Sequence, residues 1–217
     1  MKSSRPDFAE KTGLSRRRLA LLAPALLLPA TALAALAPTP GMTAGPFYPK
    51  NKPADDNADL VQVAGFEREA EGDILHLSGR VIDVHGAAVA GARVEIWQCD
   101  VNGVYRHPYD RQFAMRDPAF QGFGRTDTGQ AGRFTFRTIV PVSYPGRTPH
   151  IHVKVRREGK RTLTTQLYIK GLGQNAIDFV FYSLSSEHRR SVEMNLQPVP
   201  ASPRKAFETK IDLVLDG

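Results

Sequence analysis

The 217-residue chain is long enough for one substantial domain, and its 41% hydrophobic and 24% charged residues are typical of a folded protein rather than a disordered one. Residues 1–37 carry six Lys and Arg side chains and two acidic ones, so the net charge falls from +7 for the whole chain to +3 for the remainder. This weak positive charge does not predict nucleic-acid binding. It is equally compatible with a small anionic substrate and with an ordinary solvated surface.

Residues 1–37 have the pattern of an export signal. Arg16–Arg18 precede an apolar run, Leu19–Leu36, that ends in small-residue cleavage motifs at Ala34 and Ala37. Arginines followed by leucine resemble a twin-arginine signal, which exports folded proteins, so we expect a periplasmic or extracellular location and no other association with a membrane. The alternative is an anchor that is not cleaved, because an apolar run of about 18 residues can span a bilayer.

Cys99 is the only cysteine, so the chain cannot form an internal disulfide. A protein that folds before export does not need one in an oxidising compartment. We therefore expect Cys99 to be a small buried side chain rather than a nucleophile.

Residues 38–73 are rich in Pro, Gly, Asp and Lys and show little hydrophobic periodicity, so we expect an irregular N-terminal arm on the surface. Residues 74–217 contain short runs in which apolar and polar residues alternate, which is typical of half-buried strands. These runs are Leu75–Val81, Val94–Ile96, Phe134–Phe136, Ile151–Val155, Leu163–Ile169 and Ile211–Leu215. Their spacing predicts an all-β fold, an antiparallel β-sandwich, with residues 172–205 forming an irregular C-terminal arm.

The strongest local feature is the pair His150 and His152. On a strand, residues i and i+2 share a face, so both imidazoles point the same way while Ile151 and Val153 enter the core. Two neighbouring imidazoles on a rigid element can begin a metal site. Taken alone, however, the pattern favours two histidines on the wet face of a strand.

Two tyrosines and an arginine lie near the histidine pair or near a strand end. Tyr144 and Arg147 precede His150 in the same loop, and Tyr105 follows the strand that contains Trp97. Fe(III) is a hard ion that prefers anionic oxygen, and coordination makes a phenolate accessible well below its ordinary pKa of about 10. The other tyrosines considered are expected to be ordinary packing or surface residues: Tyr109, Tyr168 and Tyr182.

The stretch from Leu77 to Gly171 resembles the intradiol ring-cleavage dioxygenases, and it is most similar to their protocatechuate branch. The matching segments are Leu77–Val81, Val94–Gln98, Gly103–His107, Gly124–Asp127, Phe134–Ile139, Tyr144–Pro145, Arg147–His152 and Thr165–Tyr168, and Thr43–Tyr48 resembles the lead-in of that family. As an ordered set, these segments are far more specific than any one of them.

The resemblance implies a mononuclear Fe(III) site and the opening of catechol-type rings by O₂ to cis,cis-muconate-type diacids. Four positions match the iron ligands of the family: Tyr105, Tyr144, His150 and His152. Tyr144 would also leave the metal and accept a proton when substrate binds. Arg147 matches the active-site arginine, and Gln166 matches the glutamine of the family's T-Q-L-Y strand, so the resemblance implies a catalytic role for both. We expect the site at the sheet edge where the loops carrying both tyrosines converge.

Two departures from the family pattern weaken the prediction of a particular catechol. Gly146 follows Pro145 where protocatechuate dioxygenases usually have Trp, and Thr148 and Pro149 follow Arg147 where they usually have Pro-Ala. The sequence also lacks the N-terminal helical dimerisation segment of catechol dioxygenases. Separately, we expect oligomerisation through the two arms.

Two alternatives stay open from the sequence. Parts of the strands also resemble carboxypeptidase-regulatory-like β-sandwich modules, which bind without catalysis and do not require the two tyrosines and two histidines. A cupin that binds zinc or Fe(II) through its H-x-H pair would need an acidic ligand about four residues after the second histidine, where Arg156 and Arg157 stand.

Overall fold

The computed structural model describes residues 35–216, so most of the predicted export signal, residues 1–34, lies outside the described residues. The described chain contains strands β1 (Ile74–Asp83), β2 (Arg93–Trp97), β3 (Phe123–Asp127), β4 (Arg133–Ile139), β5 (His150–Arg156), β6 (Leu163–Ile169), β7 (Glu193–Met194), β8 (Gln197–Pro198) and β9 (Ala206–Leu215). Its helices are η1 (Phe113–Met115), η2 (Gly173–Ile177), α1 (Phe179–Tyr182) and α2 (Ser186–Ser191). Within this part of the chain, no helix is long and apolar enough to cross a membrane.

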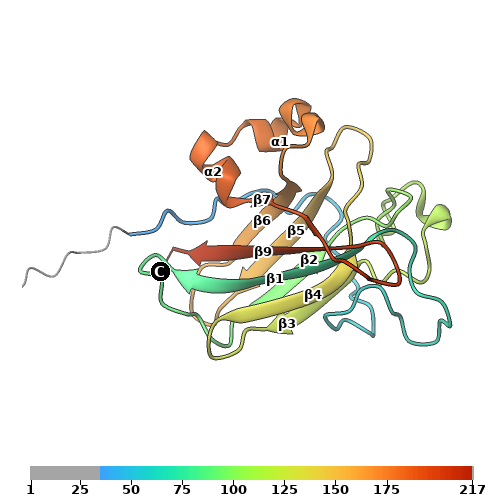
Figure 1. The fold of residues 1–217 in the computed structure, drawn as a ribbon, viewed down its shortest axis with the longest axis horizontal. Helices are drawn as coiled ribbons and strands as arrows, with labels where there is room; N and C mark the ends of the chain where they lie inside the picture. The colour runs from blue at the N-terminus through green and yellow to red at the C-terminus, as the bar shows by residue number, and fades with distance from the viewer. Residues whose placement is uncertain (1–34, 217) are drawn as a thin grey trace, which may run out of the picture. The chain divides into compact units, whose positions relative to one another are not determined.

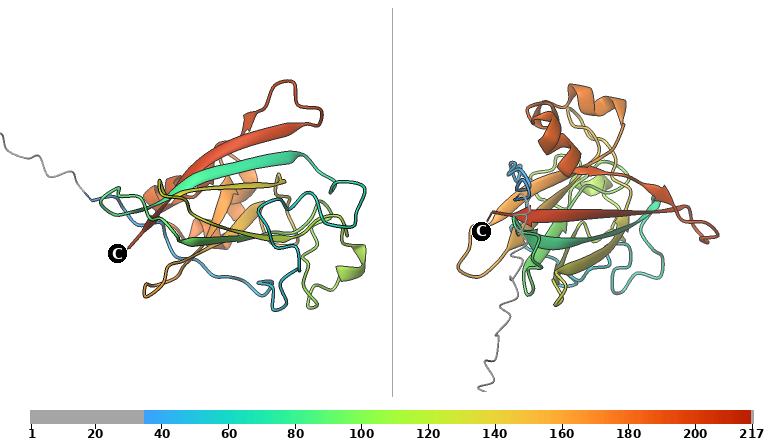
Figure 2. Two further views of the ribbon diagram at one scale, coloured as in Figure 1. Left: turned by 90° about the horizontal axis from the view of Figure 1, so that it is seen from below. Right: turned by 60° about the vertical axis from the view of Figure 1, so that its left-hand side comes forward.

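The strands form two sheets that pack face to face, which confirms the predicted all-β sandwich (Figures 1 and 2). One sheet has the order β4-β1-β9-β8 and the other β3-β2-β5-β6-β7. Both sheets are mixed rather than purely antiparallel. β9 runs parallel to β1 from the pair Ile74–Ala206 to the pair Asp83–Leu215, and β7 runs parallel to β6. Alternation indicates which side chains are buried, but it carries no information on the direction of the neighbouring strand.

The parallel pairing of β1 with β9 requires a glycine. A Cβ atom at Gly79 would lie 1.8 Å from the carbonyl oxygen of Ile211, so no larger residue fits there. On either side of Gly79, Leu77 and Val81 are almost fully buried between the sheets, as their alternation predicts. They meet Ile151 and Val153 of β5 in the same core.

The N-terminal arm, residues 38–73, has no helix or strand, as expected, apart from an isolated bridge between Asp59 and Arg137. The expectation that it lies on the surface is wrong for its second half. Leu60 and Val61 are fully buried in the main core. The backbone N–H of Leu60 donates to the carbonyl of Arg137 at 2.8 Å, so the arm covers the free edge of β4.

Residues 172–205 were expected to be irregular, and the structure shows short helices and strands there. Asp178 caps α1 by accepting hydrogen bonds from the N–H groups of Val180 and Phe181, and Ser185 caps α2 through the N–H of His188. Helices of four and six residues are too short to show a hydrophobic period, so capping side chains define them instead.

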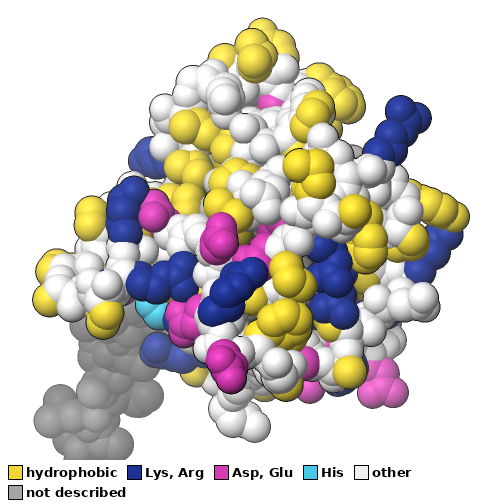
Figure 3. All heavy atoms as spheres, turned by 90° about the vertical axis from the view of Figure 1, so that its right-hand side faces the viewer, with side chains coloured by type: hydrophobic (Ala, Val, Ile, Leu, Met, Phe, Trp, Pro, Cys, Tyr) yellow, Lys and Arg dark blue, Asp and Glu magenta, His cyan; other side chains and the backbone are white. Residues whose placement is uncertain are grey.

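Positive and negative side chains alternate over one face of the molecule (Figure 3). Several charged side chains of the described chain are paired: Arg137 contacts Asp59 and Glu69, and Arg204 also contacts Glu69 at 2.9 Å. These arginines have acidic partners, so they do not form part of a basic stripe.

Candidate active site

The two histidines lie on the outer face of the five-stranded sheet, on its central strand β5. In the register of the sheet, His152 lies between Trp97 of β2 and Gln166 of β6, and His150 pairs with Tyr168. The expected position at a sheet edge is therefore wrong. The loops with the tyrosines reach over the face of the central strands from the end at which β5 begins.

All four predicted ligand side chains come together on this face. The ring of Tyr105 lies 5.4 Å from that of Tyr144 and 6.1 Å from that of His152, measured between centroids. The ring of His150 lies 4.8 Å from His152 and 5.6 Å from Tyr144. Tyr105, His150 and His152 are almost fully buried, whereas Tyr144 is half-buried. Side chains from three separate segments thus converge on one point.

Turn chemistry holds the two tyrosines in place. Tyr144, Pro145, Gly146 and Arg147 form a turn in which the N–H of Arg147 donates to the carbonyl of Tyr144 at 2.9 Å. Gly146 has a φ of 81°, which a type II turn requires at this position, after a proline. In the other loop, the carboxylate of Asp110 accepts the N–H of Tyr105 at 2.8 Å.

The imidazole of His150 is oriented to present a lone pair toward His152. The Nδ1 atom of His150 lies 2.7 Å from the carbonyl of Thr148, which places its proton on Nδ1 and leaves Nε2 free. The Nε2 atoms of His150 and His152 are 3.2 Å apart. At this separation, both Nε2 atoms could hold the same metal ion.

Burial keeps both histidines neutral, as metal ligands must be. Burial, and then the charge of Arg147, lowers the pKa of His150 to about 4. Burial lowers the pKa of His152 well below its ordinary value, and His150 and Arg147 lower it further. His152 also stacks on Trp97, with ring centroids 4.7 Å apart and planes 5° from parallel, which fixes its orientation.

The buried phenols complete a donor set that suits a hard cation. The hydroxyl of Tyr105 has no hydrogen-bond partner among the described residues, and burial raises its pKa well above the ordinary value. Burial also raises the pKa of Tyr144, while the charge of Arg147 opposes that shift. An unpaired buried hydroxyl is costly, and a metal ion would supply its missing partner.

The oxygen atoms nearest to the histidine pair that could bind a metal belong to phenols and not to carboxylates. Within residues 35–216, no three His, Cys, Asp or Glu side chains come close enough together to hold a metal. This disfavours the cupin alternative, which needs an acidic ligand.

Arg147 lies at the centre of a hydrogen-bond network beside these donors. Its Nε donates to Asp178 at 2.8 Å, its Nη2 to Gln166 at 2.5 Å, and its Nη1 lies 3.4 Å from the hydroxyl of Tyr144. Burial disfavours the charge of Arg147, but the hydrogen bond with Asp178 and nearby charges outweigh it and raise the pKa. Arg147 is thus a fixed cation at the site.

Two residues of this network were missed by the sequence analysis. The hydroxyl of Tyr168, expected to be an ordinary packing residue, donates to Gln166 at 2.8 Å and lies 3.4 Å from Arg147. Its position two residues after Gln166, on the same face of β6, could have indicated this. Asp178 lies in a segment without periodicity, and only its place before an apolar run hinted at a helix cap.

The N-terminal arm closes the buried side of the site. Gly45, with a φ of 65°, lies against His152, and a Cβ there would be 3.5 Å from the imidazole. Phe47 stacks on Tyr105 at 4.7 Å. The carbonyl of Thr43 accepts from Gln166 at 2.9 Å. Thus the arm excludes water from three of the candidate groups.

A buried carboxylate clamps this arm to the sheet. Glu95 of β2 accepts hydrogen bonds from the hydroxyl of Tyr48 at 2.8 Å and from Lys52 at 2.6 Å. Burial raises the pKa of Glu95, but Lys52 and Tyr48 outweigh burial, and the net shift is downward. Burial and the hydrogen bond with Glu95 raise the pKa of Tyr48 to about 12, so it stays a donor.

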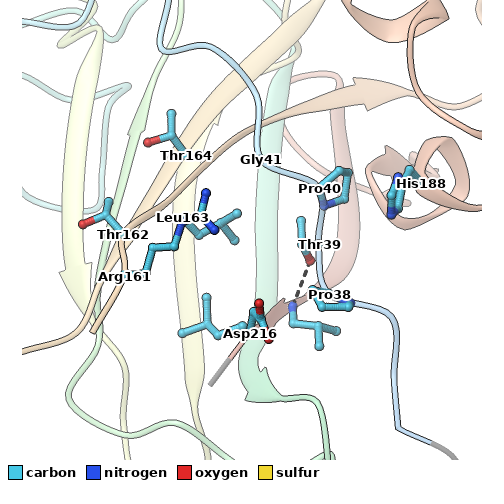
Figure 4. A pocket seen from close by; sticks show the side chains of 12 residues that line it. Pro38, Thr39, Pro40, Gly41, Arg161, Thr162, Leu163, Thr164, His188 and Asp216 are labelled. Carbon is cyan, nitrogen blue, oxygen red and sulfur yellow. Dashed lines mark hydrogen bonds between the residues drawn. The ribbon is translucent and has the colours of Figure 1, made fainter. Parts of the chain in front are cut away.

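A cavity of about 450 Å³ opens beside the site and is lined by two of its residues, Tyr144 and Arg147. A second cavity, of about 290 Å³, lies away from the ligands, between the start of the arm, β6, α2 and the end of β9 (Figure 4). There the hydroxyl of Thr39 already accepts the N–H of Val214 at 2.9 Å. A third cavity, of about 600 Å³, lies on the outer face of the other sheet.

Comparisons with known proteins identify the family of this chain. A family model described as Dioxygenase matches residues 43–217. The protocatechuate 3,4-dioxygenase beta chain of Burkholderia cepacia is 33% identical over 73% of this chain and 71% of its own length. The dioxygenase domain of a dioxygenase–carbohydrate-binding protein fusion from Streptomyces sp. SirexAA-E is 34% identical, with a TM-score of 0.64 over 83% of this chain and 99% of that domain.

The chain belongs to the intradiol ring-cleavage dioxygenases, a family of oxidoreductases. Some relatives are much longer. This chain spans only 49% of the 6-chlorohydroxyquinol 1,2-dioxygenase of Cupriavidus pinatubonensis, to which it is 34% identical. The family membership supports the enzyme interpretation and gives no support to a non-catalytic binding module.

Proposed function

We propose that this protein opens catechol-type rings with O₂ at a mononuclear Fe(III) centre, inserting both oxygen atoms and releasing a cis,cis-muconate-type diacid. The observation that carries the proposal is the convergence of two neutral imidazoles and two phenols, from three separate segments, on the outer face of β5. Fe(III), when bound, would draw electron density from the two oxygens of a catecholate and make its ring reactive toward O₂.

The four proposed ligands divide into three that would hold the iron permanently and one that a substrate could replace. Tyr105, His150 and His152 are buried and closely packed, so they suit permanent ligands. Tyr144 is half-buried and faces the cavity, so it can give way to a substrate and take up a substrate proton on its phenolate oxygen. Arg147, held by Gln166, directs its Nη1 group toward that same oxygen.

This placement gives Arg147 a defined electrostatic role. A fixed planar cation beside the reacting oxygens stabilises negative charge as it develops, without reorganisation at the moment of reaction. The arm from Thr43 to Lys52 keeps water from the opposite side, which strengthens these interactions.

The direct test is oxygen uptake by purified protein loaded with ferric iron, against a panel of catechols. The expected result is consumption of O₂ and catechol in equal amounts, with two labelled oxygens in the diacid when ¹⁸O₂ is supplied. Tyrosinate coordination should colour the protein, and Tyr105→Phe should weaken both colour and iron retention. Tyr109→Phe is the matched control, because Tyr109 is 63% exposed. A colourless protein that consumes no catechol would disprove the proposal.

We also propose that the protein is exported through the twin-arginine route. The support is the sequence of residues 1–37, together with the single buried cysteine. A protein without disulfides can fold before it is exported. Oligomerisation through the arms stays a prediction.

A further inference from the structure

The cavity of about 450 Å³ beside Tyr144 and Arg147, called the mouth below, carries almost no free charge. Nine residues line the cavity beside Tyr144, and of these described residues only Arg147 and Asp178 are charged. The two form an ion pair with an Nε–Oδ2 distance of 2.8 Å, in which the side chain of Arg147 is 12% exposed and that of Asp178 is fully buried. Arg147 stays charged, but the pair as a whole has no net charge, so the mouth offers no excess positive charge to an anionic substituent.

The hydrogen-bonding groups of this pair are also largely occupied. Besides Asp178, Arg147 faces Gln166, Tyr168 and Tyr144, so its Nε and both Nη groups have partners. A carboxylate that entered the mouth would therefore have to share the guanidinium with Asp178 and with these other acceptors. Because an unpaired buried anion is penalised heavily, such a ligand gains little there.

The carboxylate of Asp178 is also fully occupied. It accepts from the backbone N–H of Thr148 at 3.0 Å, and its other oxygen accepts from the N–H groups of Val180 and Phe181. Asp178 therefore cannot turn away to release Arg147 without uncapping α1.

The remaining lining of the cavity is uncharged. It combines Pro145 and Ile177, which is 86% exposed, with the polar side chains of Ser143, Thr148 and Gln174. Nothing lies within 4 Å of the position of a Cβ on Gly146, so the rim is not narrowed at that point. A cavity of about 150 Å³ is enough for benzene, whereas this one is about 450 Å³. The mouth therefore has room for a ring substituent and offers it a surface without free charge.

We propose that this site selects catechols whose ring substituent is uncharged over catechols that carry a carboxylate. The inference rests on the proposed function, since it concerns the substrate of the same site. It separates this chain from the activity named for its protocatechuate 3,4-dioxygenase relative.

A matched pair of probes isolates the charge. 3,4-Dihydroxybenzamide and 3,4-dihydroxybenzoate have nearly the same shape, and only the second is anionic at pH 7. We expect the iron-loaded protein to bind the amide about 10-fold or more tightly than the acid, measured anaerobically by titration of its visible absorption band. The kcat/KM values measured in O₂ should show the same order.

Surface variants test whether the charge balance of the mouth is the cause. Ile177→Lys adds a cation to the rim and should improve binding of the acid about 2- to 5-fold relative to the amide, the effect of one solvent-screened ion pair. Gln174→Lys, at another exposed lining position, should act in the same direction. Phe179→Lys is the control, because Phe179 is 75% exposed on the same segment but does not line the cavity.

The outcomes separate this inference from the proposed function. Cleavage of both probes with equal or better use of the acid would overturn the inference and leave ring cleavage intact. An unchanged ratio in both Ile177→Lys and Gln174→Lys would overturn its electrostatic cause. If the iron-loaded protein bound and cleaved neither probe, nor unsubstituted catechol, the proposed function would fail and the inference with it.

Discussion

Replacing Asp178 by serine should separate two roles that this carboxylate combines. Its Oδ1 caps α1 through the N–H groups of Val180 and Phe181, while its Oδ2 binds Arg147 and the N–H of Thr148. A serine hydroxyl can still cap the helix, but it is too short to reach the guanidinium. Asp178→Ser therefore leaves Arg147 in place without its counter-charge.

The expected loss of stability follows from the burial of the pair. Removing one partner of a buried ion pair lowers the free energy of unfolding by about 3–5 kcal/mol. Arg147 is 12% exposed and keeps its bond to Gln166, so we expect about 2–3 kcal/mol for Asp178→Ser. Adding Arg147→Ala removes the unpaired charge, and the double variant should be about 1–3 kcal/mol more stable than the sum of the single variants predicts.

Urea unfolding of the metal-free proteins measures this coupling without any contribution from iron. Asp178→Ala is the companion variant, and it should lose about 1 kcal/mol more than Asp178→Ser because the cap is lost as well. If the two single effects add to within about 0.5 kcal/mol, Asp178 and Arg147 do not act as a pair and the reasoning fails.

The same pair predicts a pH dependence of stability. Burial raises the pKa of Asp178, but the N–H groups of Phe181 and Thr148 and the charge of Arg147 outweigh it, so the pKa is lowered on folding. A carboxylate with a lowered folded-state pKa stabilises the protein above its ordinary value of about 3.9, and this contribution is lost as the pH falls below it. The difference in unfolding free energy between the native protein and Asp178→Ser should therefore shrink below about pH 4.

Three further variants test the site and the export signal. Arg147→Ala should keep iron and colour but lower turnover by about 10²–10³, and Arg147→Lys should recover only part of the loss, as measured by oxygen uptake; near-normal turnover of Arg147→Ala would contradict the role of this residue. Tyr105→Phe should reduce bound iron and bleach the visible absorption while Tyr109→Phe does not, and equal spectra would argue against Tyr105 as a ligand. Replacing Arg16 and Arg17 by lysine should leave the protein in the cytoplasm, so an unchanged exported yield would exclude the twin-arginine route.

Much of the fold could be predicted because its strands alternate regularly. Leu75, Leu77 and Val81 face the core, and the polar residues between them face outward, as a period of two requires. The direction of β9 could not be predicted in this way, because a parallel and an antiparallel neighbour of β1 demand the same alternation. The close approach of the two strands is visible only in the structure, where a Cβ atom at Gly79 would clash with the backbone of Ile211.

Less of the site than of the fold could be predicted from the sequence. The pair His150 and His152 was visible because both positions belong to one strand. Tyr105 and Tyr144 could be joined to it only through a family resemblance, since the loops that carry them meet only in three dimensions. Asp178 had neither a periodic pattern nor a matching motif, although it binds Arg147 directly.

Periodicity indicates on which face of a strand a side chain lies, but it does not indicate what covers that face. By alternation, His150 and His152 belong to the outer face of the sandwich, where solvent is the ordinary neighbour. Here Phe47 of the arm and the loop with Tyr105 lie over that face, and both imidazoles are 1% exposed. Burial is what removes their charge, because His150 would otherwise titrate near pH 6.5. The irregular arm, which has no strand or helix of its own, therefore makes an ordinary outer sheet face into a place where a metal could be held dry.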